Sequence, residues 1–79
     1  MNWVMPNLLP SAAIRAELAS RGLFQVDVAK KLGITPGQVG RRMNGEIDWR
    51  LDELNAIAEM LGVPVSTLID APTAASKAS

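Results

Sequence analysis

The chain has 79 residues and equal numbers of basic and acidic side chains, so it carries no net charge at pH 7. This length suits one domain with a single modest core, and 48% hydrophobic against 20% charged residues favours a folded chain. Cysteine and histidine are both missing, which excludes disulfides, zinc sites built from Cys and His, cysteine nucleophiles and histidine bases.

The two ends of the chain differ from the rest. Residues 1–10, MNWVMPNLLP, are apolar and contain two prolines, so we expect an extended N-terminal arm lying across the core. Residues 71–79, APTAASKAS, are small and polar and are predicted to form a disordered tail. Neither a basic leader nor a membrane-length apolar run is present, so we expect no signal peptide and no contact with a membrane.

A folded domain is predicted over residues 11–70, and it begins with a helix. Pro10 and Ser11 can open this helix, and Gly22 can end it. Ile14 and Leu18 lie four residues apart, which places both on the inner face.

A second helix is predicted over residues 25–32 and a third over residues 36–43. Gly33 ends the second helix, Thr35 is a good N-cap for the third, and Pro36 falls at the first helical position. The inward apolar residues of the two helices are Val28, Ala29, Leu32 and Val39.

A fourth helix is predicted over residues 51–61, with two acidic residues in its first turn, where the helix dipole favours negative charge. Its apolar stripe consists of Leu51, Leu54, Ile57, Ala58 and Leu61. Pro64 and Ser66 can start a short fifth helix that continues through Ile69. Because no stretch alternates with period two, the predicted fold class is all-α, a compact bundle of about five short helices.

The spacing of three residues in the middle of the chain is typical of a helix-turn-helix. Ala29 is small enough to let two helices approach closely, and Gly33 can adopt a positive φ where the chain turns. Val39, six residues later, can pack back on the second helix. An ordinary helical hairpin has the same spacing, so spacing alone leaves both readings open.

Residues 14–69 resemble the helix-turn-helix family of phage repressors and Cro proteins (the Xre type), most closely its versions from actinobacteria and their phages. The segments that carry the resemblance, in chain order, are Arg21-Gly22-Leu23, Gln25, Ala29-Lys30-Lys31-Leu32-Gly33-Ile34, Val39, Asn44-Gly45, and Leu54, Ala58 and Leu61-Gly62-Val63. The resemblance implies a lambda-repressor-like fold in which the third helix enters the DNA major groove and the second crosses the backbone.

The charges are unevenly distributed along the neutral chain. Residues 25–44 hold four basic and one acidic side chain, a local charge of +3. Residues 46–70 hold six acidic and one basic side chain, a local charge of −5. We therefore expect a basic DNA-facing side and an acidic back, which phosphates repel.

Four residues at the front of the third helix are predicted to face base edges: Pro36, Gly37, Gln38 and Arg41. Gln38 can pair bidentately with adenine, and Arg41 with guanine. The alternative for Arg41 is an ordinary solvated charge.

A second set is predicted to contact phosphates: Gln25, Lys31, Arg42 and Asn44. In the family, the glutamine at the position of Gln25 also braces the third helix, whereas a solvated helix start is the alternative. The position of Arg42 is usually apolar and inward in the family, but Met43 could take the core role and leave Arg42 to turn toward a phosphate. Asn44 could instead be a left-handed helix cap, and solvation is the alternative for Lys31.

Three residues depart from the family pattern. Phe24 stands where a Ser or Thr usually caps the second helix, at a loss of about 1 kcal/mol. Gly37 and Gly40 each lower the helix propensity of the third helix by roughly 1 kcal/mol relative to Ala. We therefore expect that helix to be loose in the free protein and the chain to rely partly on DNA shape.

The predicted function is a sequence-specific regulator that binds double-stranded DNA, a Cro or immunity-type repressor that occludes a promoter in the cytoplasm of a bacterial host cell. A palindromic operator is expected, bound by a weak homodimer or by a dimer formed on DNA, through the arm around Trp3 or the fifth helix around Val65 and Leu68. No enzymatic activity, cofactor, metal or small-molecule substrate is expected. The alternative is an antitoxin or adaptor that binds another protein, which exposed Phe24 and Trp49 side chains would favour.

Overall fold

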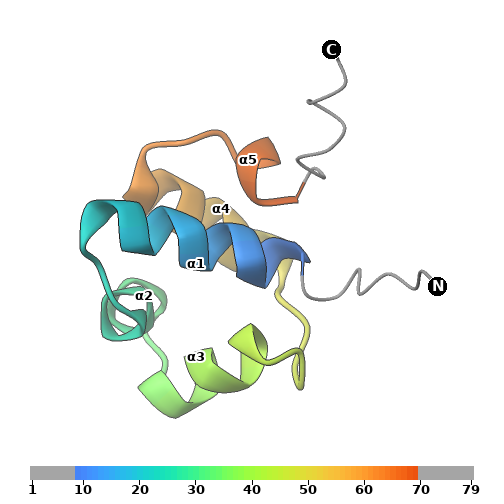
Figure 1. The fold of residues 1–79 in the computed structure, drawn as a ribbon. Helices are drawn as coiled ribbons and strands as arrows, with labels where there is room; N and C mark the ends of the chain where they lie inside the picture. The colour runs from blue at the N-terminus through green and yellow to red at the C-terminus, as the bar shows by residue number, and fades with distance from the viewer. Residues whose placement is uncertain (1–8, 70–79) are drawn as a thin grey trace, which may run out of the picture.

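Five helices follow one another in the computed structural model, which describes residues 9–69 (Figure 1). They are α1 (Leu9–Arg21), α2 (Gln25–Leu32), α3 (Pro36–Met43), α4 (Leu51–Leu61) and α5 (Ser66–Ile69). No β-strand occurs in this part of the chain, so the predicted all-α class is confirmed.

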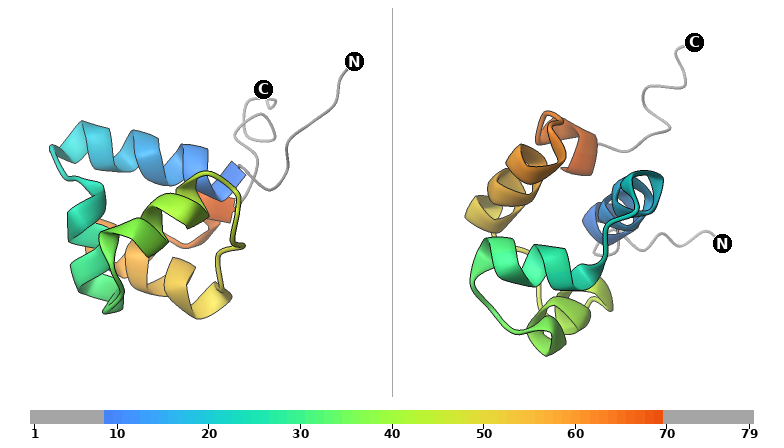
Figure 2. Two further views of the ribbon diagram at one scale, coloured as in Figure 1. Left: turned by 90° about the horizontal axis from the view of Figure 1, so that it is seen from below. Right: turned by 90° about the vertical axis from the view of Figure 1, so that its left-hand side faces the viewer.

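Helix α1 packs mainly against α5, and α2 packs against both α3 and α4. Helix α4 also contacts α1 and α5, so it joins the two pairs. Figure 1 and the right-hand view of Figure 2 place α3 and α5 at opposite ends of the domain. The recognition helix predicted from the sequence therefore lies far from α5.

The core is assembled from all five helices, as the apolar spacing predicts. Its buried apolar residues are Ile14, Leu18, Val28, Ala29, Val39, Met43, Leu54, Ile57, Ala58, Leu61 and Leu68. Since Leu68 is fully buried, it is not available for the dimer contact that the sequence suggested, and Val65 beside it is half-buried.

The predicted start of the first helix needs correction. Helix α1 begins at Leu9, so Leu9 and Pro10 are helical and do not belong to an extended arm. Proline is tolerated in the first turn, where its missing N–H has no partner to lose. The rest of the predicted arm and the tail lie outside the described residues.

Leu51, predicted to lie in the apolar stripe of α4, is 63% exposed, whereas Leu54 is buried. Helical periodicity gives the direction of a residue around the axis, but not whether another element is present at that height. Leu51 is the first residue of α4, and its neighbours Arg50 and Asp52 are exposed as well.

Helices α2 and α4 begin without a side-chain acceptor at the N-cap, which is Phe24 in one and Arg50 in the other. In both, the carboxylate three residues later accepts from the N-cap amide. Asp27 Oδ2 lies 2.8 Å from the Phe24 nitrogen, and Glu53 Oε1 lies 3.0 Å from the Arg50 nitrogen. Half of a capping box therefore offsets part of the loss expected at Phe24.

The two leucines at the start of α4 provide a matched test of this packing. Leu54→Ala is expected to lower the free energy of unfolding by about 2–5 kcal/mol, because it leaves a cavity in the core. Leu51→Ala is expected to change it by no more than about 0.5 kcal/mol. Urea denaturation followed by circular dichroism measures both, and equal losses would contradict the exposure of Leu51.

Candidate nucleic-acid interface

Helices α2 and α3 are joined by a tight turn that fixes one against the other. Gly33 adopts φ 72° and ψ 31°, and its N–H donates to the carbonyl oxygen of Ala29 over 2.8 Å. The Ile34 N–H donates to the same oxygen over 3.1 Å. Ala29 and Val39 are buried where the two helices pack, as the helix-turn-helix spacing predicts.

The exposed side of α3 carries all four residues predicted to face bases: Pro36, Gly37, Gln38 and Arg41. Thr35 caps the helix, because its Oγ1 accepts from the Gln38 N–H over 3.1 Å. The Gln38 side chain folds back toward this cap, where its Oε1 lies 3.5 Å from the Thr35 nitrogen. Arg41 has the longest side chain of the four, and within residues 9–69 this side chain makes no hydrogen bond or ion pair.

Gln25 reaches from the start of α2 to the surface of α3. Its side chain is half-buried, and its Oε1 lies 3.9 Å from the position that a Cβ at residue 40 would occupy. A Cβ at residue 40 would be in ordinary van der Waals contact with this oxygen, so the glutamine lies at the junction of the two helices without requiring a glycine there. This position agrees with the bracing role that the family resemblance implies for Gln25.

Arg42 does not turn outward as predicted, and Met43 takes the core position. The Arg42 Nε lies 3.0 Å from Glu53 Oε1 on α4, and its Nη1 donates to the Gln38 carbonyl oxygen over 3.2 Å. The two charged side chains are only 12% and 11% exposed. Because Glu53 at the start of α4 faces the end of α3, the guanidinium is held between the two helices.

A chain of hydrogen bonds ties the same end of α3 to α1. The Trp49 Nε1 donates to Ser11 Oγ over 3.0 Å, and Ser11 Oγ donates to the Arg42 carbonyl oxygen over 3.0 Å. Ser11 is 2% exposed and Trp49 is half-buried. We call Ser11, Arg42, Trp49 and Glu53 the C-terminal clamp of α3.

Sequence reasoning did not find the clamp. It used Ser11 only as a helix start and Glu53 only as a favourable charge in the first turn of α4. A signal was present for Glu53, because a carboxylate at the third position of a helix without a Ser or Thr cap often accepts from the N-cap amide. Nothing in the sequence pattern indicates the pairing of Ser11 with Trp49.

Asn44 is exposed and adopts φ −87° and ψ −4°, in the right-handed region. The residue with a positive φ at this end of the helix is Gly45, at 84°. Asn44 is therefore not a left-handed cap, and its exposed side chain stays available for a contact outside the domain.

Ion pairing changes the charge distribution inferred from the sequence. Lys31 on α2 lies 3.3 Å from Glu59 Oε1 on α4, and Arg42 pairs with Glu53. Two of the four basic side chains in the +3 segment are thus paired with residues of the predicted acidic back. Among residues 9–69, the basic side chains without an ion pair are Arg15, Lys30 and Arg41.

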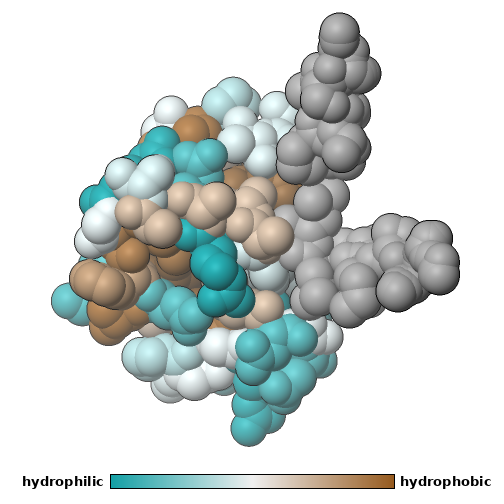
Figure 3. Space-filling model, in the orientation of Figure 1, coloured by the Kyte–Doolittle hydropathy of each residue, from teal (hydrophilic) through white to brown (hydrophobic). Residues whose placement is uncertain are grey.

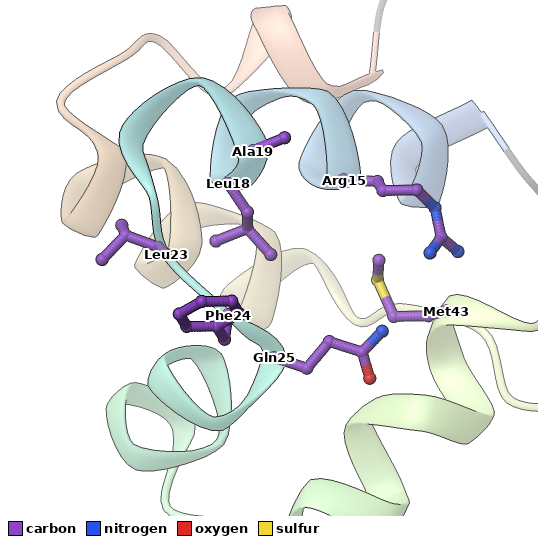
Figure 4. A pocket seen from close by; sticks show the side chains of 7 residues that line it. All are labelled: Arg15, Leu18, Ala19, Leu23, Phe24, Gln25 and Met43. Carbon is purple, nitrogen blue, oxygen red and sulfur yellow. The ribbon is translucent and has the colours of Figure 1, made fainter.

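A hollow of about 260 Å³ opens between α1, α2 and the end of α3. It is lined by Arg15, Leu18, Ala19, Leu23, Phe24, Gln25 and Met43 (Figure 4). Most of its wall is apolar, and Phe24 at its edge is 69% exposed. On the face shown in Figure 3, hydrophobic surface lies over the region of α2 and borders hydrophilic surface.

The described residues show two further absences. No group of three or more acidic side chains within residues 9–69 is placed to hold a metal ion. Within the same range, no helix combines the length and apolar character needed to cross a bilayer.

The comparisons with known proteins agree with this geometry. The helix-turn-helix family model matches residues 14–68, so the chain belongs to the helix-turn-helix family of DNA-binding transcriptional regulators. The crystal structure of the clp gene regulator ClgR from C. glutamicum has the same fold, with a TM-score of 0.74. That protein is 22% identical to this one over 95% of this chain and 96% of its own. A search of curated proteins finds no match.

The buried ion pair of the clamp and an exposed ion pair on α4 can be compared by double-mutant cycles. Arg42→Met and Glu53→Gln are expected to couple by about 0.5–3 kcal/mol in the free energy of unfolding, because each leaves a desolvated partner behind. Arg50 Nε and Asp52 Oδ1 are 3.2 Å apart, but both side chains are more than 70% exposed.

Arg50→Gln and Asp52→Asn are accordingly expected to couple by less than about 0.5 kcal/mol. Both cycles are measured by urea denaturation in the same buffer. Coupling of equal size in the two pairs would show that the clamp pair contributes no more than a surface contact.

Proposed function

We propose that the chain is a sequence-specific repressor that binds an operator in double-stranded DNA through α3 and occludes a promoter, in the manner of a phage Cro or immunity repressor. The observation that carries the proposal is the exposed face of α3 around Arg41, held on the buried contact between α2 and α3. An eight-residue helix fixed in this way is the element that enters the major groove in helix-turn-helix complexes.

Base reading is assigned to Arg41 and Gln38. Arg41 has no carboxylate partner among the described residues, so its guanidinium is available for the N7 and O6 atoms of guanine. The 3.5 Å contact between Gln38 and Thr35 is long for a hydrogen bond, and it can be exchanged for a contact to adenine at little cost. Pro36 and Gly37 present backbone and little side chain to the groove.

Phosphate contacts are assigned to Gln25, Asn44 and Lys31. The Lys31 ion pair is exposed, and such pairs contribute little, so a phosphate can replace Glu59 as its partner. Arg42 is different, since its pair with Glu53 is nearly buried. We assign Arg42 to positioning α3 and not to a phosphate.

The operator is proposed to be palindromic and to bind two copies of the chain. A single module of this size buries too little DNA surface for high affinity, and two half-sites one helical turn apart remove this limit. Ile69 on α5 is 39% exposed at the end of the domain opposite α3, which suits a contact between copies better than buried Leu68 does.

One observation favours the second candidate, an antitoxin or adaptor that binds another protein. Phe24 exposes a large aromatic side chain beside an apolar hollow, and exposed apolar patches of this kind mark protein-binding surfaces. Trp49 does not support it, because its indole is half-buried and donates to Ser11.

The base-reading role of Arg41 can be tested on duplexes recovered with the wild-type chain from a random-sequence pool. Arg41→Ala is expected to lose about 1–3 kcal/mol of discrimination at one base pair per half-site. Arg50→Ala removes an exposed arginine at the N-cap of α4 and serves as the control that is expected to keep base preference. Binding titrations against single-base variants of the duplex measure both proteins. If Arg41→Ala weakens every duplex equally, Arg41 does not read bases; if the wild type selects no duplex, the interaction-module function replaces this one.

The stoichiometry of the complex tests the palindromic operator. Sedimentation of the protein with a duplex carrying both half-sites is expected to show two chains per duplex, bound more tightly than on a single half-site. One chain at saturating protein, with no gain from the second half-site, would contradict the dimer.

A further inference from the structure

We infer that Arg15 on α1, which the sequence did not single out, contacts a DNA phosphate next to Gln25. The inference rests on the proposed function and extends the DNA-contacting surface from α2 and α3 to a third helix. It also identifies the hollow between these helices as the place where the DNA backbone lies.

Arg15 lies at the same opening as Gln25, a residue of the proposed interface, and the core residue Met43. It lines the hollow of about 260 Å³ together with Gln25 at the start of α2 and Met43 at the end of α3. Figure 4 shows the Arg15 side chain extending from α1 along this opening, and the Gln25 amide pointing into it from the other side. A phosphate between the two side chains would be next to α3, because Gln25 also packs beside Gly40.

The charge of Arg15 has no partner within the described domain. Arg21, six residues later on the same helix, forms an ion pair with Glu17 and donates to the Glu17 carbonyl oxygen over 3.0 Å. Arg15 is exposed and forms no ion pair with residues 9–69. Its guanidinium is therefore available for an anion from outside the domain.

The wall of the hollow suits a phosphate held by a guanidinium. Leu18, Ala19 and Phe24 offer no side-chain acceptor that would compete with an anion for the Arg15 guanidinium. The hollow is open to solvent, so a phosphate at its mouth can stay hydrated on one side and avoid most of the cost of desolvation. The planar guanidinium can donate two parallel hydrogen bonds to phosphate oxygens, and the Gln25 amide supplies another donor.

Such a contact would set the register of the protein on the duplex. Phosphate contacts fix the position of a protein on DNA without reading sequence, and their number determines how steeply affinity falls with salt. Since Arg42 is held in a nearly buried ion pair, Arg15 supplies positive charge that the +3 segment delivers only in part.

The experiment compares Arg15→Gln with Arg21→Gln, a matched removal of one positive charge from the same helix. Each variant and the wild type are titrated, at a series of salt concentrations, with the duplex that the wild type selects and with an unrelated duplex of equal length. We expect Arg15→Gln to weaken binding to both duplexes by a similar factor and to reduce the slope of log affinity against log salt by about one unit per bound chain. Arg21→Gln should keep the wild-type slope, and Arg15→Lys should keep most of it.

Thermal unfolding shows whether each variant is folded, and Arg15→Lys tests the charge independently of the glutamine. The inference is overturned if Arg15→Gln keeps the wild-type affinity and slope, or if Arg21→Gln reduces the slope equally. In both cases wild-type binding would leave the proposed function standing. If the wild type binds no duplex at any salt concentration, the proposed function fails, and the inference fails with it.

Discussion

The position of α3 depends on contacts at its two ends, because a helix of eight residues with two glycines has little stability of its own. At its start, Thr35 satisfies the amide of Gln38. At its end, the clamp connects Arg42 to Ser11 on α1 and to Glu53 on α4. We therefore expect any looseness of the free helix to be confined to the turns between these anchors. The exposed face of α3, proposed to enter the DNA groove, thus takes its geometry from the rest of the domain.

The basic residues of the described domain fall into two groups, those that form an ion pair and those that do not. Arg42 connects α3 to α4 through a nearly buried ion pair, whereas the exposed pair of Lys31 with Glu59 contributes little to stability. Arg15, Lys30 and Arg41 have no such partner within the described residues. A neutral domain can therefore present positive charge to DNA, while many of its carboxylates act inside the fold as partners and caps.

The sequence predicted the helices, their order and the core well, because apolar spacing and the stop and cap residues act locally. Thr35 with Pro36 marks the start of α3, and Gly33 marks the turn before it. The prediction failed where the outcome depends on an element far away in sequence. Leu51 lies in line with the apolar stripe of α4, but its side chain is exposed. Arg42 pairs with Glu53, eleven residues later, and no local sequence pattern indicates this pair. Arg15 was overlooked for the same reason, since its place at the hollow depends on how α1 meets α2 and α3.

The two glycines of α3 leave the interface open to change during evolution. A Cβ at Gly37 would meet only Thr35 Oγ1, and one at Gly40 only Gln25 Oε1, both at 3.9 Å, which is an ordinary van der Waals distance. Neither glycine has the positive φ that resists a side chain. A single substitution at the exposed Gly37 can therefore add a new side chain to the exposed face of α3 without disturbing the core, and it also raises helix propensity. If α3 reads DNA as proposed, new operators are within reach of one mutational step, and a lineage of such proteins can diverge in the sites it recognises while its fold stays constant.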